Sequence, residues 1–193
     1  MTRTRRRLTR RRRAALTGQV LVPFAIVLLV LTVLLTALLG GLRESSDYRA
    51  IQDRLQAAAL AGAGTGSVGS LVSGSPTLAC AAATCAGVAA SPCPDALAAD
   101  PDGATAAGRA CLFLRQELAA LYGGPRARVD VTDALAHARV AVAQAGQACP
   151  DAPEHVYHFA TLCLTDDPYV GILAQDGLGV RFHMVARAQI VYR

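Results

Sequence analysis

The order of apolar and polar residues divides the chain into an N-terminal apolar run, a helical stretch and a C-terminal part with strand periodicity. Residues 20–42 are almost wholly aliphatic, and no ionisable side chain occurs between Arg13 and Arg43. Because a helix rises about 1.5 Å per residue, this run is long enough to cross a hydrocarbon layer about 30 Å thick. It is too long for the apolar part of a cleaved signal, which spans about 7 to 15 residues. The pattern predicts an uncleaved membrane anchor over residues 19–42.

Residues 43–63 continue the helical pattern. Tyr48, Ile51 and Leu55 recur at three- and four-residue steps, and polar side chains occupy the opposite face. This periodicity predicts an amphipathic helix that extends the anchor. Its apolar face has two possible uses, covering the protein's own sheet or packing against a partner helix. We expect partner-helix packing at Tyr48, Ile51 and Leu55.

Residues 64–110 interrupt the periodic pattern because they are rich in glycine, serine, alanine and cysteine. Such a composition favours irregular loops. A second amphipathic pattern follows over residues 108–124 and ends at consecutive glycines. Its apolar side consists of Leu112, Leu114, Leu118 and Leu121.

From residue 126 onward the apolar period changes from about 3.6 to 2. Strand-like alternation occurs in residues 126–131, 136–145, 155–165 and 180–193. Alternation of this kind suits an antiparallel sheet with one covered face. Residues 111–193 are therefore predicted to form a helix followed by an antiparallel sheet. The predicted fold class is α+β, with a long N-terminal transmembrane helix that extends into an extracytoplasmic domain.

Charge is distributed unevenly along the chain. The formal net charge is +5, but eight arginines and no acidic residue lie in residues 1–13, so the rest of the chain is acidic. A basic tail beside an apolar run is typical of a topogenic signal near anionic lipid, and it does not indicate a nucleic-acid partner. We therefore expect residues 1–18 in the cytoplasm, a single pass through the bacterial cell membrane, and the C-terminal domain outside. The arginines next to the anchor are Arg10, Arg11, Arg12 and Arg13.

All six cysteines follow the apolar run, and their number is even. This distribution is typical of disulfides in an oxidising compartment. The sequence leaves every pairing open, with a preference for short local loops. No C-x-x-C pair or tight Cys/His cluster indicates zinc, and we expect no metal and no other cofactor. The preferred pairs are Cys80 with Cys85, Cys93 with Cys111, and Cys149 with Cys163.

Residues that could support catalysis are scattered. His155 and His158 would point to opposite faces of a strand, so a shared metal is not expected. Asp166 and Asp167 precede Pro168, a sequence typical of a solvated turn. Neither a G-x-S-x-G nor an H-E-x-x-H motif is present. We predict that the protein is not an enzyme and has no small-molecule substrate.

Two segments carry a resemblance to a known family. The run "GQVLVPFAIVLLVL" and the later "YRAIQDRLQAAALAGA" together resemble the N-terminal module of TadE/TadG-like proteins, which belong to tight-adherence (Flp) pilus assembly systems. The resemblance covers residues 10–65 well and the rest loosely. It implies a pilin-like extracytoplasmic domain, and as partners the lipid bilayer and other membrane proteins of a pilus or secretion system.

One position departs from the processed members of that group. Pseudopilins cut by a prepilin peptidase resemble G-x-x-x-x-E, and taking Gly18 as the glycine puts Pro23 at the glutamate position. Proline supplies no charge and has no backbone N–H. We therefore expect no cleavage after Gly18.

These patterns predict a non-catalytic, single-pass membrane component of a Flp/tight-adherence-type pilus or secretion assembly, similar to a pseudopilin-like assembly factor. The alternative is a membrane-tethered extracellular binding module that uses its disulfide-rich residues 74–110. That region offers no aromatic anchor of the kind found at binding hot spots.

Overall fold

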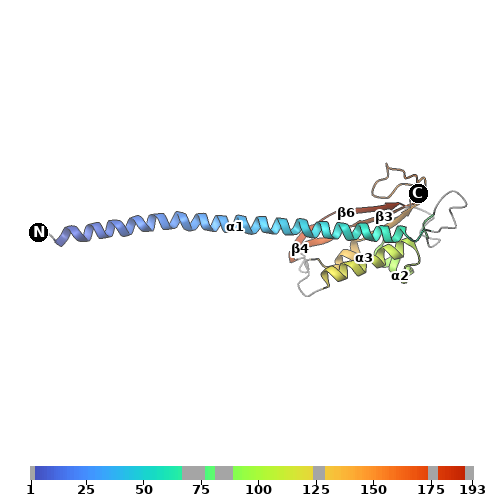
Figure 1. The fold of residues 1–193 in the computed structure, drawn as a ribbon, viewed down its shortest axis with the longest axis horizontal. Helices are drawn as coiled ribbons and strands as arrows, with labels where there is room; N and C mark the ends of the chain where they lie inside the picture. Colours follow the sequence, from blue (N-terminus) through green and yellow to red (C-terminus); the bar gives the residue numbers. More distant parts are fainter. Residues whose placement is uncertain (1–2, 67–76, 81–88, 124–128, 174–177, 190–193) are drawn as a thin grey trace. The chain divides into compact units, whose positions relative to one another are not determined.

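The computed structural model describes residues 3–66, 77–80, 89–123, 129–173 and 178–189. The chain divides into two compact units, Met1–Ser45 and Ser46–Arg193. Figure 1 shows the elements of both.

Helix α1, Arg3–Ala63, contains the predicted tail, anchor and helical extension in a single helix, with Pro23 inside it. The prediction of a transmembrane helix is contradicted. No helical stretch in the described part of the chain combines the length and the hydropathy that a bilayer crossing requires. The α+β part of the fold prediction and the small antiparallel sheet are present.

The second unit contains two antiparallel sheets (Figure 1). The larger has the strand order β1-β2-β3-β6, and the smaller is the β4–β5 hairpin. Three further helices follow α1 in the described ranges. The elements are β1 (Ser91–Pro92), α2 (Cys93–Ala99), α3 (Ala106–Tyr122), α4 (Val131–His137), β2 (Arg139–Ala143), β3 (Thr161–Asp166), β4 (Tyr169–Leu173), β5 (Leu178–Arg181) and β6 (Met184–Gln189).

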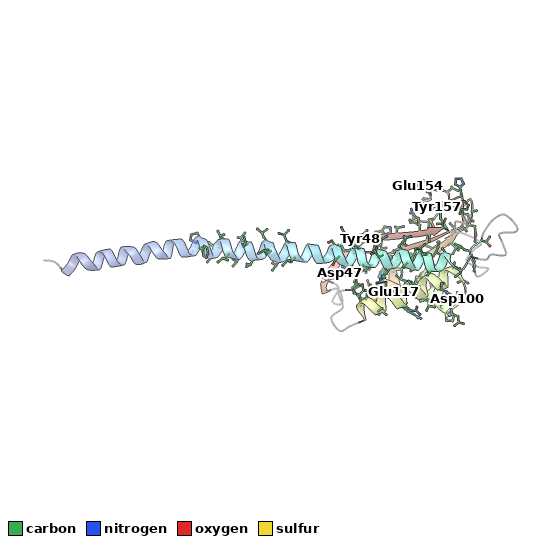
Figure 2. All side chains as sticks on the ribbon, viewed as in Figure 1. Asp47, Tyr48, Asp100, Glu117, Glu154 and Tyr157 are labelled. Atoms are coloured by element: carbon green, nitrogen blue, oxygen red, sulfur yellow. A yellow bond between two sulfur atoms is a disulfide. The ribbon has the colours of Figure 1, made fainter. Side chains whose placement is uncertain are left out.

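The two faces of the larger sheet pack against different layers. Alternate residues such as Leu162 and Leu164 join the main core with α1 and α3, whereas Cys163 belongs to a smaller cluster on the other face. The layer over that second face comes from residues 144–160. Figure 2 accordingly places Tyr157 on the opposite side of the sheet from Glu117 of α3.

Two short elements differ from the sequence prediction. Of the strand expected at residues 126–131, residues 126–128 lie outside the described residues, and Val129 forms only an isolated bridge with Val170. Helix α4 begins at Val131, because the Asp130 carboxylate accepts hydrogen bonds from the N–H groups of Thr132 and Asp133 and caps a helix there. Helix α2 lies within the region expected to be irregular, and Pro94 in its first turn suits a helix start.

The predicted final strand is also two strands. β5 pairs with β4 and β6 pairs with β3, so the alternating run after residue 178 passes from one sheet to the other. The segment between β3 and β5, where no strand was predicted, contains β4.

Candidate functional site

The described side chains of residues 22–39 form an exposed apolar surface, here called the apolar segment. Its large apolar side chains are 47% to 65% exposed in the structure. They occupy most positions of this segment, so they point to every side of the helix. Figure 2 shows side chains standing out on both sides of this part of α1. Thr32 and Thr36 donate their hydroxyl hydrogens to carbonyls of the preceding turn at 2.8 to 3.0 Å. The segment therefore offers apolar contact without free hydroxyl donors.

The residues expected to contact a partner helix, Tyr48, Ile51 and Leu55, lie outside the apolar segment. Ile51 and Leu55 are fully buried in the core of their own domain. Tyr48 is half-buried, and its ring contacts Phe182 edge-on at a centroid distance of 5.4 Å. Partner-helix packing at Ile51 and Leu55 is therefore a wrong prediction, because their side chains already cover the protein's own sheet.

The polar face of the same helix also has an internal role. Gln52 Nε2 donates to the carbonyl of Val185 at 2.8 Å, and Gln56 Nε2 donates to the carbonyl of Arg187 at 3.1 Å. These carbonyls belong to β6, the last strand of the described larger sheet. The two glutamines therefore occupy acceptors that an edge strand would otherwise present to another chain.

The alanine and glycine positions in residues 57–63 of α1 permit close packing. A Cβ at Gly62 would lie 2.6 Å from the Ala106 carbonyl oxygen and 2.9 Å from the Ala110 Cβ. Ala58 and Ala59 are fully buried. This segment thus brings α1 and α3 together within the domain, and the ion pair Arg54–Glu117 at 2.7 Å joins the same two helices.

Two of the three preferred disulfides are confirmed. Cys93 pairs with Cys111, with an S–S distance of 2.01 Å, and Cys149 pairs with Cys163. Cys80 is disulfide-bonded, but Cys85 lies outside the described residues. Arg10, Arg11, Arg12 and Arg13 lie in α1, in a stretch whose side chains are outside the described part.

A charged cluster surrounds the end of β3. Asp166, expected in a solvated turn, is fully buried, and neither carboxyl oxygen has a hydrogen-bond partner in the structure. Nearby, Arg181 Nη2 lies 3.4 Å from Asp133 Oδ1, and Arg181 stands 4.0 Å above the Tyr169 ring. His183 Nδ1 lies 2.8 Å from Asp167 Oδ1.

Burial raises the pKa of the Asp166 carboxyl to about 8, because the charged form loses its hydration. The neighbouring Asp167 N–H lowers this pKa in part, and the negative charges of Asp167 and Asp133 raise it further. Arg181 lowers it. Asp166 is therefore protonated at neutral pH, which explains how the core holds a carboxyl without a partner.

The sequence contained a signal for this burial. Leu162, Leu164 and Asp166 have the same parity, so extending the strand by one step puts Asp166 on the buried face. The Asp-Asp-Pro sequence obscured that signal because it resembles a turn.

A cavity of about 220 Å³ lies between α2, the start of α3 and β2. Small side chains such as Ala96, Ala99 and Ala107 form much of its lining, and Asp100 is at its edge. Asp100 accepts hydrogen bonds from the hydroxyl and the backbone N–H of Thr105, the N-cap residue of α3, each at 2.6 Å. The hydrogen bond from the Thr105 hydroxyl is the main cause that lowers the pKa of Asp100. This carboxylate is therefore engaged in holding the fold.

Individual histidines of the described chain contact different neighbours. His137 Nδ1 lies 2.8 Å from the Asp133 carbonyl oxygen, and His155 packs edge-on against Tyr157. Across the ranges that the structure describes, no group of three or more His, Cys, Asp or Glu side chains is arranged to hold a metal ion.

Comparison with known proteins returned no match: no family, no curated protein and no solved structure corresponds to this chain.

Proposed function

We propose that this protein is a non-catalytic component of a bacterial pilus or secretion assembly of the tight-adherence type. The observation that carries the proposal is the apolar segment, residues 22–39, whose large side chains are exposed on every side. Exposing apolar surface to water costs a free energy of about 25 cal/mol per Å². The functional state of the protein therefore has this surface covered.

We propose that the apolar segment is covered by apolar helices of other assembly proteins at the cell membrane and by the lipid around them. The disulfides Cys93–Cys111 and Cys149–Cys163 support a globular domain in an oxidising compartment outside the cytoplasm. The resemblance over residues 10–65 supports the type of assembly.

The alternative, a tethered binding module, has the cavity beside α2 as its support. Ligand pockets combine apolar walls with a few polar groups that fix the orientation of a ligand. Asp100, one of the charged groups at this cavity, already accepts two hydrogen bonds from Thr105. We therefore favour the assembly role.

The test places a charge in the apolar segment by a Leu31→Arg substitution in cells that make such pili. Leu31 is 52% exposed, so the change leaves the globular core untouched. We expect the variant protein to accumulate with its disulfides formed, while surface pili and co-purification with the assembly proteins are lost. Gln116→Arg, at an exposed position of α3, is the matched control and should retain both. Normal pili with Leu31→Arg would contradict the proposal.

A further inference from the structure

The cavity beside α2 exists because small side chains from three elements line it. Ala96 and Ala99 of α2, Ala107 of α3 and Ala141 of β2 stand where larger side chains would fill the space. Protein interiors leave few spaces larger than a water molecule, whereas this cavity has a volume of about 220 Å³. Ala99 is exposed, so the cavity opens to the surface beside α2.

The size and the walls of the cavity suit a single long side chain. Pockets that hold drug-sized ligands have volumes of about 300 to 1,000 Å³, so this cavity is small for a metabolite. Val140 and Val142 of β2 complete the apolar walls that the alanines begin. Such walls fit a stem of methylene groups whose polar end stays near the surface.

The charged groups at the cavity are all negative. Its described lining residues include Asp95 and Asp100 and no basic side chain. Asp95 is exposed in the first turn of α2. Within the described residues it forms no ion pair and no side-chain hydrogen bond, so both of its carboxylate oxygens can accept from a ligand.

Asp100 keeps its charge although its oxygens accept hydrogen bonds. The donors are neutral: the hydroxyl and N–H of Thr105 and the N–H of Ala104. The Thr105 hydroxyl is the main cause that lowers the pKa of Asp100, so this carboxyl is ionised at neutral pH. The same contacts occupy N–H groups just before α3, which leaves them unable to hold an anion. The cavity therefore favours a cationic ligand.

We propose that this cavity holds one arginine side chain of an assembly partner. The methylene stem lies against the alanine and valine walls, and the guanidinium pairs with Asp95. A guanidinium presents two parallel N–H groups that match both oxygens of a carboxylate, and Asp100 adds a second negative charge nearby. That the arginine belongs to an assembly protein rests on the proposed function, but the preference of the cavity for a guanidinium does not.

NMR titration of the full-length protein in mild detergent tests the preference. The probes are N-acetylargininamide and N-acetylcitrullinamide, which has nearly the same shape but no charge. We expect the arginine probe to shift the amide signals of α2 and of residues 140–142 at millimolar concentrations. The citrulline probe should bind at least about tenfold more weakly, because it forms no charge-assisted pair.

Two variants at exposed positions locate the binding. Ala99→Met fills the cavity and Asp95→Asn removes the carboxylate, and each should lower the affinity for the arginine probe by about tenfold or more. The matched controls are Ala98→Met, exposed on α2 but outside the lining, and Asp102→Asn, an exposed carboxylate away from it. Both controls should bind as the wild type does.

Three results would overturn the cavity as a guanidinium site. One is equal affinity for the two probes, and another is unchanged affinity in Ala99→Met. The third needs no variant: signal shifts of the wild-type protein that spread over its surface without including residues 140–142. Each is measured on the purified protein, so none depends on the pilus test with Leu31→Arg, which addresses the assembly role.

Photo-crosslinking in cells tests the source of the arginine. A diazirine side chain at Ala99 should form adducts with an assembly protein, and the crosslinked peptide should contain an arginine. The Asp95→Asn change in the same protein should reduce these adducts, whereas Asp102→Asn should not. Adducts that form equally with Asp95→Asn, or a crosslinked peptide without arginine, would overturn the assignment to a partner's side chain.

Discussion

The buried side chains of α1 between residues 48 and 63 pack within their own domain. Ile51 and Leu55 fill the core, Gln56 reaches a β6 carbonyl, and Gly62 lies against α3. The apolar face was predicted from the sequence, but periodicity shows only that a face is covered. It does not distinguish a sheet of the same chain from a partner, because both remove the same apolar area from water.

Ile51→Ala tests this assignment at a single residue. Removing a fully buried isoleucine side chain leaves a cavity, so we expect the domain to lose about 2 to 5 kcal/mol of unfolding free energy. Urea denaturation followed by circular dichroism measures the change. Leu60→Ala, at a position 57% exposed on the same helix, is the control and should have little effect. Equal stability of the two variants would mean that Ile51 is not in the core.

Between elements, the glutamines of α1 occupy carbonyl groups at the edge of β6. The predicted sheet and α3 were found because their apolar residues repeat over several turns or alternations. Helices α2 and α4 were missed because each has seven residues, too few to display a period. In α4, capping by Asp130 also outweighs the alternation that had indicated a strand. The link between Gln52, Gln56 and β6 was beyond sequence analysis because it joins positions more than a hundred residues apart.

Replacing both glutamines tests the protection of β6. In Gln52→Leu/Gln56→Leu the carbonyls of Val185 and Arg187 lose their donors, at about 1 kcal/mol for each hydrogen bond. We also expect the exposed edge to promote self-association. Light scattering coupled to size exclusion chromatography measures the association, and Gln116→Leu is the control at an exposed site. An unchanged mass distribution for the double variant would show that something else covers this edge.

The two confirmed disulfides hold different layers of the second unit. Cys93–Cys111 joins α2 to α3, and Cys149–Cys163 joins the 144–160 layer to β3. Each loop is short, so we expect removal of either bond by paired alanine substitution to lower stability by about 3 kcal/mol. Only loss of Cys149–Cys163 should make residues 144–160 sensitive to limited proteolysis. Cleavage at that layer in the Cys93→Ala/Cys111→Ala variant would show that the layers are not held independently.

Along the whole chain, two stretches of α1 differ in the exposure of their apolar side chains. The apolar segment is exposed within its own unit. In residues 46–63 of α1, most apolar side chains are buried in the core of the second unit. We therefore propose that partners contact residues 22–39, whereas Ile51 and Leu55 lie in the core of their own domain. This reverses the expectation drawn from the sequence for those two residues.

The most direct test is site-specific photo-crosslinking in cells, with a diazirine side chain placed at Leu31 or at Ile51. Each position carries a side chain of similar size, so the two proteins differ in where the probe lies. We expect Leu31 to form adducts with proteins identified by mass spectrometry as parts of a pilus or secretion assembly, and Ile51 to form only crosslinks within its own chain. Intermolecular adducts from Ile51, together with none from Leu31, would contradict the account.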